Sequence, residues 1–187
     1  MILQNNGTQI NSPSATPGLR LLHALTLRRL LSFGPESTQL ELQSLNVLIG
    51  PNGSGKSNLL EAIALLRATP NRGSPHDLRT VIGRGGGVGE WIWKGDPKGV
   101  ATLEAVVDNP LGQQPLRHML AFRSEQQTFR LYDERIENEN PYPGETGPYF
   151  YYRYHHGQPV LNIKNGQRRL TSESVELDQS ILAQRYD

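Results

Sequence analysis

The chain has 187 residues, which is enough for one domain with a small addition and for a substantial core. Its 19 basic and 18 acidic residues give a formal charge of +1, which excludes a bulk field that would by itself attract nucleic acid or an anionic membrane. The absence of cysteine excludes disulfides, thiolate zinc sites and cysteine nucleophiles.

Residues 1–19 are rich in Asn, Gln, Ser, Thr and Pro, and contain too few apolar residues to repay the entropy of ordering. We predict that they form a mobile polar tail. They lack the basic and apolar regions of a signal peptide, and no run in the sequence approaches a membrane span. We therefore expect a soluble cytoplasmic protein with no membrane partner.

Residues 20–73 are predicted to form a strand, loop and helix core. Alternating and continuous apolar runs favour two or three strands with a turn at Gly34 and Pro35, and residues 45–49 are apolar enough for a central strand. A glycine-rich loop follows. The helix after it has apolar residues at helical spacing: Leu59, Leu60, Ile63 and Leu66.

Residues 74–90 are predicted to form a short helix and a connector. Ser74 can cap the helix, and Pro75 suits its first position. Residues 83–90, "GRGGGVGE", do not match a dinucleotide-binding fingerprint, because the third glycine required falls on Val88. We interpret them as a flexible connector.

Residues 91–171 have the pattern of an antiparallel β lobe, in which short strand-like runs alternate with turn signals. Asn165 and Gly166 predict a tight hairpin. Residues 172–187 look like the start of a helical region that is cut short. The strand-like runs are "EWIW", "VATLEAVV", "LRHMLAF", "TFRLYDERI", "YFYYRYH", "PVLNIK" and "QRRLT".

The segment "GPNGSGKS" matches the phosphate-binding loop G-x-x-x-x-G-K-S/T. Its glycines let backbone N–H groups approach phosphate oxygens at the start of a helix, where the helix dipole is positive. Lys56 would reach the β and γ phosphates, and the Ser57 hydroxyl would be a ligand of Mg²⁺. The predicted nucleotide-binding residues are Gly50, Pro51, Asn52, Gly53, Ser54, Gly55, Lys56, Ser57 and Asn58.

The stretch "GPNGSGKSNLLEAI", preceded by "LTLRRLLSF" and "LNVLIG", resembles the N-terminal segment of RecF/SMC-like ABC-class ATPases. The likeness is strongest to bacterial AAA-family ATPases related to OLD-type proteins. It covers residues 25–67 closely and the later β lobe more loosely. It implies an α/β fold: the N-terminal part of a P-loop NTPase core with an inserted antiparallel β subdomain. It also implies ATP and Mg²⁺ as cofactors, a head-to-head homodimer and action on DNA.

Hydrolysis also needs carboxylates that hold the metal and orient the attacking water. In the family that the chain resembles, these residues lie downstream on a strand that ends in Asp-Glu. Asp133 and Glu134 imitate that ending, but we interpret them as a solvated strand end within the β lobe. Asp108 is followed by a turn rather than by Glu, and residues 170–174 lack the glycine of the signature loop. The catalytic residues are therefore unknown.

The resemblance implies further residues near the nucleotide. Gln179 or Gln184 would be the glutamine that senses the metal, although an exposed helical Gln is the simpler interpretation. The strand and turn that the family places beside the nucleotide contain Arg29, Ser32 and Phe33.

His155 and His156 invite a metal site, and the neighbouring tyrosines invite a base-stacking platform. Adjacent strand residues point to opposite faces, so the two histidines cannot easily share a metal. Cross-strand packing of Tyr149, Tyr151, Tyr152 and Tyr154 is favoured over either site.

The sequence thus predicts Mg²⁺-dependent ATP binding, with hydrolysis requiring downstream carboxylates and a second head. One alternative is a small P-loop kinase, whose lid would use Arg79, Arg84 and Arg123. The other is a non-catalytic module in which the nucleotide orders a surface for a partner protein.

Overall fold

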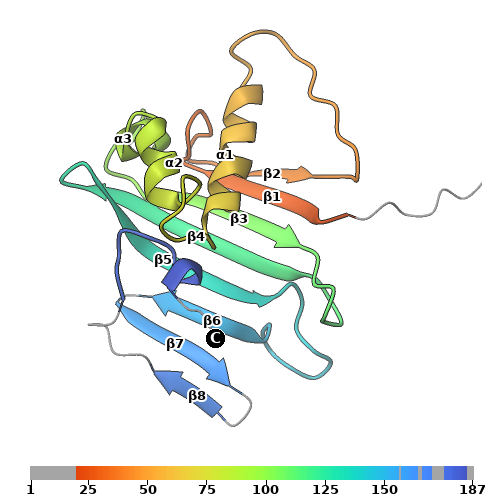
Figure 1. Cartoon of the computed structure of the whole chain (residues 1–187). Coiled ribbons are helices and arrows are strands. Elements are labelled where there is room, and N and C mark those ends of the chain that lie inside the picture. Colours follow the sequence, from red (N-terminus) through yellow and green to blue (C-terminus); the bar gives the residue numbers. More distant parts are fainter. Residues whose placement is uncertain (1–19, 156, 164–165, 170–174, 185–187) are drawn as a thin grey trace, which may run out of the picture.

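The computed structural model describes residues 20–155, 157–163, 166–169 and 175–184. The predicted polar tail lies outside these residues. Figure 1 shows one broad sheet with helices over one face. The elements are β1 (Leu22–Arg28), β2 (Thr38–Glu41), α1 (Lys56–Ala68), α2 (Leu78–Arg84), α3 (Val88–Trp91), β3 (Ala101–Val107), β4 (Leu116–Glu125), β5 (Thr128–Asn138), β6 (Phe150–His155), β7 (Gln158–Ile163), β8 (Gly166–Arg169) and the 3₁₀ helix η2 (Leu182–Gln184).

The eight strands form a single sheet in the order β2-β1-β3-β4-β5-β6-β7-β8, and every neighbouring pair is antiparallel. The strand pattern predicted from residue 101 onward is confirmed. The sheet also includes β1 and β2, so it is continuous with the part of the chain that precedes the phosphate loop. The described residues thus form a mostly antiparallel sheet with few helices, and an α/β core with an inserted subdomain is not confirmed.

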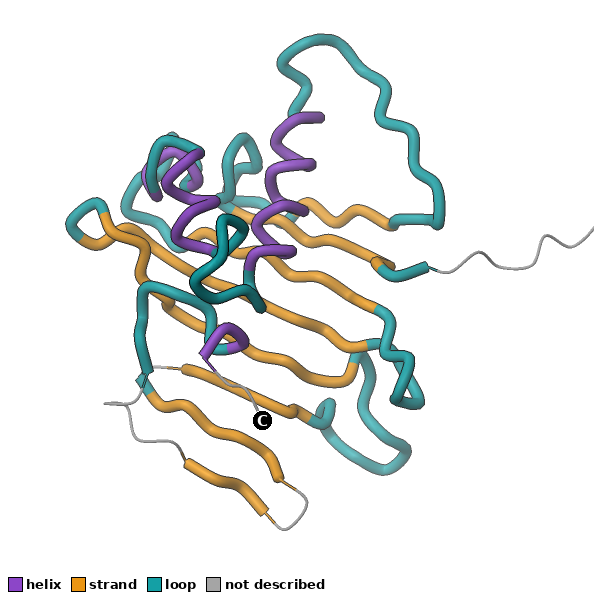
Figure 2. Tube along the Cα trace, viewed as in Figure 1, coloured by secondary structure: helices purple, strands orange, loops and turns teal. Residues whose placement is uncertain are grey.

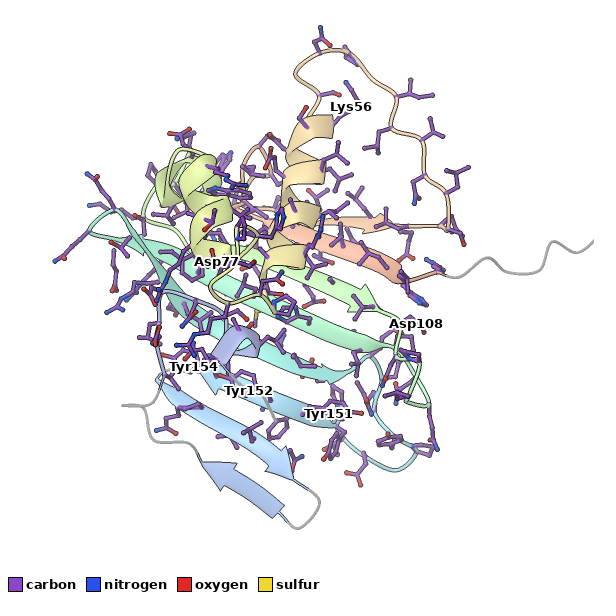
Figure 3. The ribbon with its side chains drawn as sticks, viewed as in Figure 1. Lys56, Asp77, Asp108, Tyr151, Tyr152 and Tyr154 are labelled. Carbon is purple, nitrogen blue, oxygen red and sulfur yellow. The ribbon has the colours of Figure 1, made fainter. Side chains whose placement is uncertain are left out.

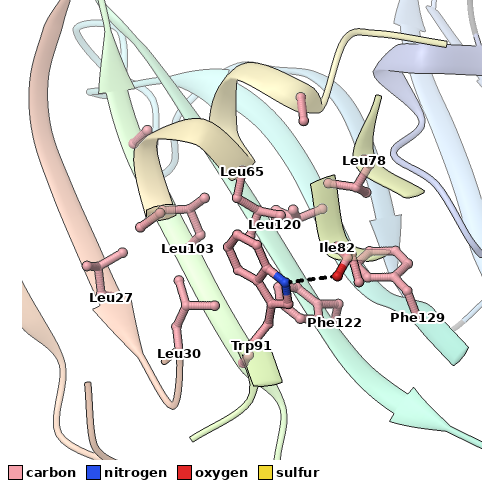
Figure 4. Close-up of a cluster of buried hydrophobic side chains, with 14 of the residues drawn as sticks. Leu27, Leu30, Leu65, Leu78, Ile82, Trp91, Leu103, Leu120, Phe122 and Phe129 are labelled. Carbon is pink, nitrogen blue, oxygen red and sulfur yellow. Dashed lines mark hydrogen bonds between the residues drawn. The ribbon is translucent and has the colours of Figure 1, made fainter. Parts of the chain in front are cut away.

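Helices α1, α2 and α3 lie on the same face of the sheet (Figure 2). Alternate residues of the central strands point toward them, because successive side chains of a strand face opposite sides. Leu27, Leu103 and Leu120 are aligned by the strand register and are each at most 1% exposed. Trp91 fills the space between these strands and α2, where its Nε1 donates a hydrogen bond to the Ile82 carbonyl at 3.4 Å (Figure 4).

The central strand predicted at residues 45–49 is wrong. This segment is part of a loop between β2 and α1, and the side chains of Leu45, Val47 and Ile49 are 83%, 74% and 90% exposed. An apolar run becomes a central strand only when neighbouring strands can pair with it on both sides. The eight strands of the sheet pair only with one another, so they supply no such neighbours.

The connecting region is more ordered than predicted. Helix α2 begins after Asp77, whose carboxylate accepts a hydrogen bond from the Thr80 N–H at 2.8 Å, so Asp77 and not Ser74 is the cap. Residues 83–90 are not a flexible connector, because they include the end of α2 and the start of α3. The predicted strand "EWIW" is also wrong, since Trp91 ends α3 and only Ile92 forms an isolated bridge, to Leu30.

At the C-terminal side, β7 and β8 form the predicted hairpin, although Asn165 lies outside the described residues. Residues 170–174 also lie outside them. Residues 175–184 pack on the sheet and contain η2 as their single described helical turn.

Candidate nucleotide-binding site

The glycine-rich loop at residues 50–55 leads directly into α1, which begins at Lys56. Gly53 and Gly55 have φ values of +81° and +89°, a left-handed conformation that glycine adopts without steric cost. These two glycines let the loop backbone curve sharply at the N-terminus of the 13-residue helix. Figure 3 places Lys56 at the end of α1 that lies farther from the sheet.

The Lys56 ammonium group lies inside the loop. Its Nζ donates hydrogen bonds to the carbonyl oxygens of Gly50 and Pro51, both at 2.7 Å, and lies 3.3 Å from Ser54 Oγ. These contacts hold a positive charge where the loop backbone and the helix N-terminus converge. The N–H groups of the first helical turn have no acceptor within the helix, so the same place offers donors to an anion.

Ser57 and Asn58 occupy the first turn of α1, and the Ser57 side chain is exposed. A hydroxyl in this position can coordinate a hydrated divalent cation beside a bound phosphate chain. The loop packs closely at Gly50, where a side chain would collide with Ser54: a Cβ at this position would lie 2.9 Å from Ser54 Oγ. The donors and the hydroxyl therefore fit a nucleotide with Mg²⁺, and their binding role stays a prediction.

A strained turn lies beside the loop. Ser32 Oγ is 3.2 Å from the position that a Cβ would take at Gly55, so the turn after β1 reaches the C-terminal end of the phosphate loop. Arg29 and Leu31 have φ values of +49° and +54°, which non-glycine residues rarely adopt. Trp93 helps to hold the turn, since its N–H donates to the Arg29 carbonyl at 2.9 Å.

Of the three residues proposed from this turn, Ser32 is thus the one placed against the loop. Arg29 points elsewhere, with Nε 3.3 Å from Asp96 Oδ2. Phe33 is half-buried against the hydrophobic core. The turn can present a hydroxyl to a bound nucleotide, and the cost of its two left-handed residues is consistent with a functional position.

An apolar groove of about 320 Å³ separates the loop before the phosphate-binding segment from α1. Leu42, Leu48, Leu59 and Ile63 contribute to its lining. The lining of the groove is mostly apolar, yet it includes none of residues 50–58. We therefore assign the phosphate site from the backbone and Lys56, and not from this groove.

The acidic residues that imitate the family's catalytic carboxylates have other surroundings. Glu134 is fully buried inside β5, so the interpretation as a solvated strand end is wrong. Asp133 lies on the other face of β5, with Oδ2 2.6 Å from His155 Nδ1. Asp108 follows the C-terminal end of β3, well separated from Lys56 in Figure 3.

Neither candidate glutamine reaches the phosphate loop. Gln179 is 5% exposed, and its Nε2 donates to Glu176 Oε2 at 2.5 Å. The Gln184 amide bonds to both backbone groups of Glu176, with distances of 2.7 and 2.8 Å. The expectation that such a Gln is exposed is wrong for both, because residues 175–184 pack against β5, apart from the outer end of α1 (Figure 1).

The tyrosines of β6 divide between the faces of the sheet. Tyr152 and Tyr154 are at most 5% exposed on the helix side, whereas Tyr151 is 37% exposed and donates to Asn138 Oδ1 at 3.1 Å (Figure 3). Burial raises the pKa of the Tyr154 hydroxyl. Cross-strand packing is therefore confirmed for the buried pair, and His156 lies outside the described residues.

The arginines of the kinase alternative are mostly engaged in ion pairs. Arg79 contacts Glu176 and Asp178 at 2.9 and 2.6 Å, and Arg123 contacts Glu125. Bonding to Asp178 raises the pKa of Arg79. This arrangement does not favour a lid that closes on a substrate.

A lysine held inside a glycine-rich loop at the start of a helix defines the class of P-loop nucleotide-binding proteins. Over residues 45–187 the chain matches the AAA_21 family, described as "AAA domain, putative AbiEii toxin, Type IV TA system". The match covers most of the chain, and the chain belongs to this family of P-loop ATPases. Comparison with curated proteins finds no match.

No described helix has both the length and the apolar character needed to cross a membrane. Within the same residues, His, Asp and Glu side chains form no group of three that could hold a metal ion. A magnesium ion at Ser57 would also take water and the phosphates of the nucleotide as ligands.

Proposed function

We propose that the chain binds ATP together with Mg²⁺ through residues 50–58, as the N-terminal part of a RecF/SMC-like ATPase. The observation that carries the proposal is the position of Lys56, whose ammonium group is held within the loop by the Gly50 and Pro51 carbonyls. Family membership supports nucleotide binding. The Ser57 hydroxyl would bind the metal, and Ser32 would contact the nucleotide from the neighbouring turn.

Hydrolysis by this proposal needs carboxylates from downstream sequence and a second head. The acidic residues that the sequence offered for this purpose are committed to other contacts, as with Glu134 and Asp133. Residues 45–49 support a need for further sequence or a second head. They are apolar and exposed, and such a segment is suited to pair with strands that the described sheet does not supply. A head-to-head homodimer and contact with DNA remain expectations from the resemblance.

Calorimetric titration of the 187-residue chain with ATP tests the proposal. We expect binding in the presence of Mg²⁺, weaker binding with EDTA, and little or no turnover. Lys56→Ala should abolish the heat of binding while leaving the melting temperature almost unchanged, because the Lys56 contacts lie within an exposed loop. Lys94→Ala is the matched control, since Lys94 pairs with Glu90 on the surface.

Two results would contradict the proposal in different ways. An absence of both heat and thermal shift at millimolar ATP would reject nucleotide binding by this chain. Robust steady-state hydrolysis that Lys56→Ala abolishes would show that the catalytic carboxylates are present within these 187 residues. Phosphoryl transfer from labelled ATP to a small acceptor would favour the kinase alternative.

A further inference from the structure

The buried carboxylate of Glu134 holds a C-terminal segment against the sheet, away from the phosphate loop. A β-bulge brings it there: Phe122 pairs with Leu131 and Ala121 pairs with Asp133, so Tyr132 is an extra residue in β5. The extra residue reverses the alternation. Leu131 and Glu134 therefore face the helix side together, and the Glu134 side chain is 0% exposed.

Glu134 is satisfied mainly by residues 175–184, which we call the strap. Its Oε1 accepts a hydrogen bond from Ser180 Oγ at 2.5 Å, and its Oε2 accepts one from the Ile181 N–H at 2.7 Å. His118 Nε2, on β4, lies 3.1 Å from Oε1. A buried carboxylate that lost these partners would carry a large desolvation cost, so its contacts to the strap form or break together.

The strap is also closed upon itself. The Gln184 side chain bonds to both backbone groups of Glu176 at the other end of the segment. Within the segment, the N–H groups of Ala183 and Gln184 donate to the carbonyls of Ser180 and Ile181 at 3.2 and 2.9 Å. Such internal bonding favours movement as one unit over fraying residue by residue.

The strap has further links to the rest of the molecule, since Ile181 is 2% exposed within the hydrophobic core and Leu177 packs against that core. The Leu131 N–H donates to the Leu177 carbonyl at 2.7 Å, beyond the point where β6 ceases to pair with β5. Glu176 and Asp178 form the ion pairs with Arg79, and Glu176 also pairs with Arg72 at 3.1 Å. These side chains are about one third to one half exposed, and such pairs contribute little. Figure 1 shows the strap in dark blue, crossing over β5 toward α2.

We propose that the strap opens and closes as one unit and that Glu134 is its latch. Opening exposes the Glu134 carboxylate to water and frees Arg79 of its acidic partners, while the eight-stranded ladder stays paired. Glu134 is thus a positioning residue, which fixes where residues 175–184 lie on the sheet. The proposal does not depend on nucleotide binding.

Hydrogen exchange of the 187-residue chain tests the latch. The reporters are the amide protons of Ile181, Ala183 and Gln184, and the references are amides of β3 and β4. In Glu134→Gln, one carboxylate oxygen becomes an NH₂ group that cannot accept from the strap. We expect the reporters to exchange about tenfold faster or more, with the references changed less than twofold.

Two variants complete the test. Glu137→Gln is the matched control, because Glu137 is a second buried carboxylate of β5 but lies near the Arg117 and Arg153 guanidinium groups instead of the strap. It should leave the reporters unchanged. Ser180→Ala keeps the carboxylate and removes one donor, so it should give a smaller acceleration confined to the strap.

Unchanged reporter exchange in Glu134→Gln would overturn the proposal. So would an equal acceleration of reporters and references, which would mean that Glu134 holds the whole sheet and not the strap alone. If Glu134→Gln does not fold, Ser180→Ala decides the question by the same two criteria.

Discussion

The sheet and the phosphate-binding region are held by different kinds of interaction. In the sheet, residues such as Leu103 and Leu120 are completely enclosed between the strands and the helices. In the segment from residue 43 to residue 58, order comes from left-handed glycines and from hydrogen bonds of Asn46 and Lys56, while Val47 and Ile49 are open to water. Burial of apolar area is the larger stabilising effect, so the sheet carries the stability of this chain.

This difference teaches that the residues proposed to bind the nucleotide can change without loss of the fold. Enzymes often place reactive groups on loops that a rigid scaffold positions. Here the scaffold reaches the loop at two points: the buried residues of α1, such as Leu59, and the strained turn that brings Ser32 to Gly55. Stability and binding should therefore respond to separate sets of substitutions.

The largest effect on stability is expected in the sheet. Phe122 is 0% exposed, and its ring centroid lies 4.9 Å from that of Phe129. Phe122→Ala should lower the free energy of unfolding by about 3–5 kcal/mol, because it removes buried area and leaves a cavity. Urea denaturation measures this change. Leu111→Ala is the control, because Leu111 is 99% exposed and should cost nothing measurable.

An effect of Phe122→Ala below about 1 kcal/mol would contradict the view that the sheet carries the stability of the chain. It would mean that the sheet core can collapse around the cavity or contributes little.

Much of the sheet could be predicted from the sequence because its information is local. In β3 the buried residues Ala101, Leu103 and Ala105 alternate with less buried ones, and the turn signals between strands mark the hairpins. The position of the phosphate loop could also be predicted, since its chemistry requires fixed residue types at fixed spacing. Local patterns suffice where each strand pairs with the next one along the chain.

Other features could not be predicted because they depend on distant partners. The run at residues 45–49 has the composition of a central strand, but pairing is a property of its neighbours and not of the run. The burial of Glu134 could not be predicted, because the bulge at Tyr132 reverses the alternation and no local signal announces a bulge without glycine. Ser180, its partner, is 46 residues away.

A smaller effect is expected at the cap of α2, between the two regions. Asp77→Ala removes the bond to the Thr80 N–H and should cost about 1 kcal/mol. The same bond has a pH signature. Burial raises the pKa of Asp77, but hydrogen bonds from Thr80 and Gly73 outweigh it and hold the pKa below its ordinary value of 3.8.

A carboxyl whose pKa is depressed on folding stabilises the protein above its unfolded pKa, and this contribution is lost as the pH falls through the folded value. The stability difference between the wild type and Asp77→Ala should therefore be constant near neutral pH and shrink below about pH 4. Denaturation curves at several pH values measure it. A difference that grew on acidification would contradict the assignment of Asp77 as a charged cap.

The smallest effect on stability is expected where the sequence alone would predict a large one. If residues 45–49 formed a central strand of this chain, Val47→Lys would place a charge in the core and unfold it. Because the Val47 side chain is 74% exposed, we expect a change within about 0.5 kcal/mol, as for an ordinary surface position. The variant should also lower the tendency of the chain to associate, since it interrupts an exposed apolar run. Urea denaturation and sedimentation measure the two quantities on the same samples. A loss of 2 kcal/mol or more would mean that the segment is paired in solution, and the contrast between an enclosed sheet and an open phosphate-binding region would then fail at its most exposed residues.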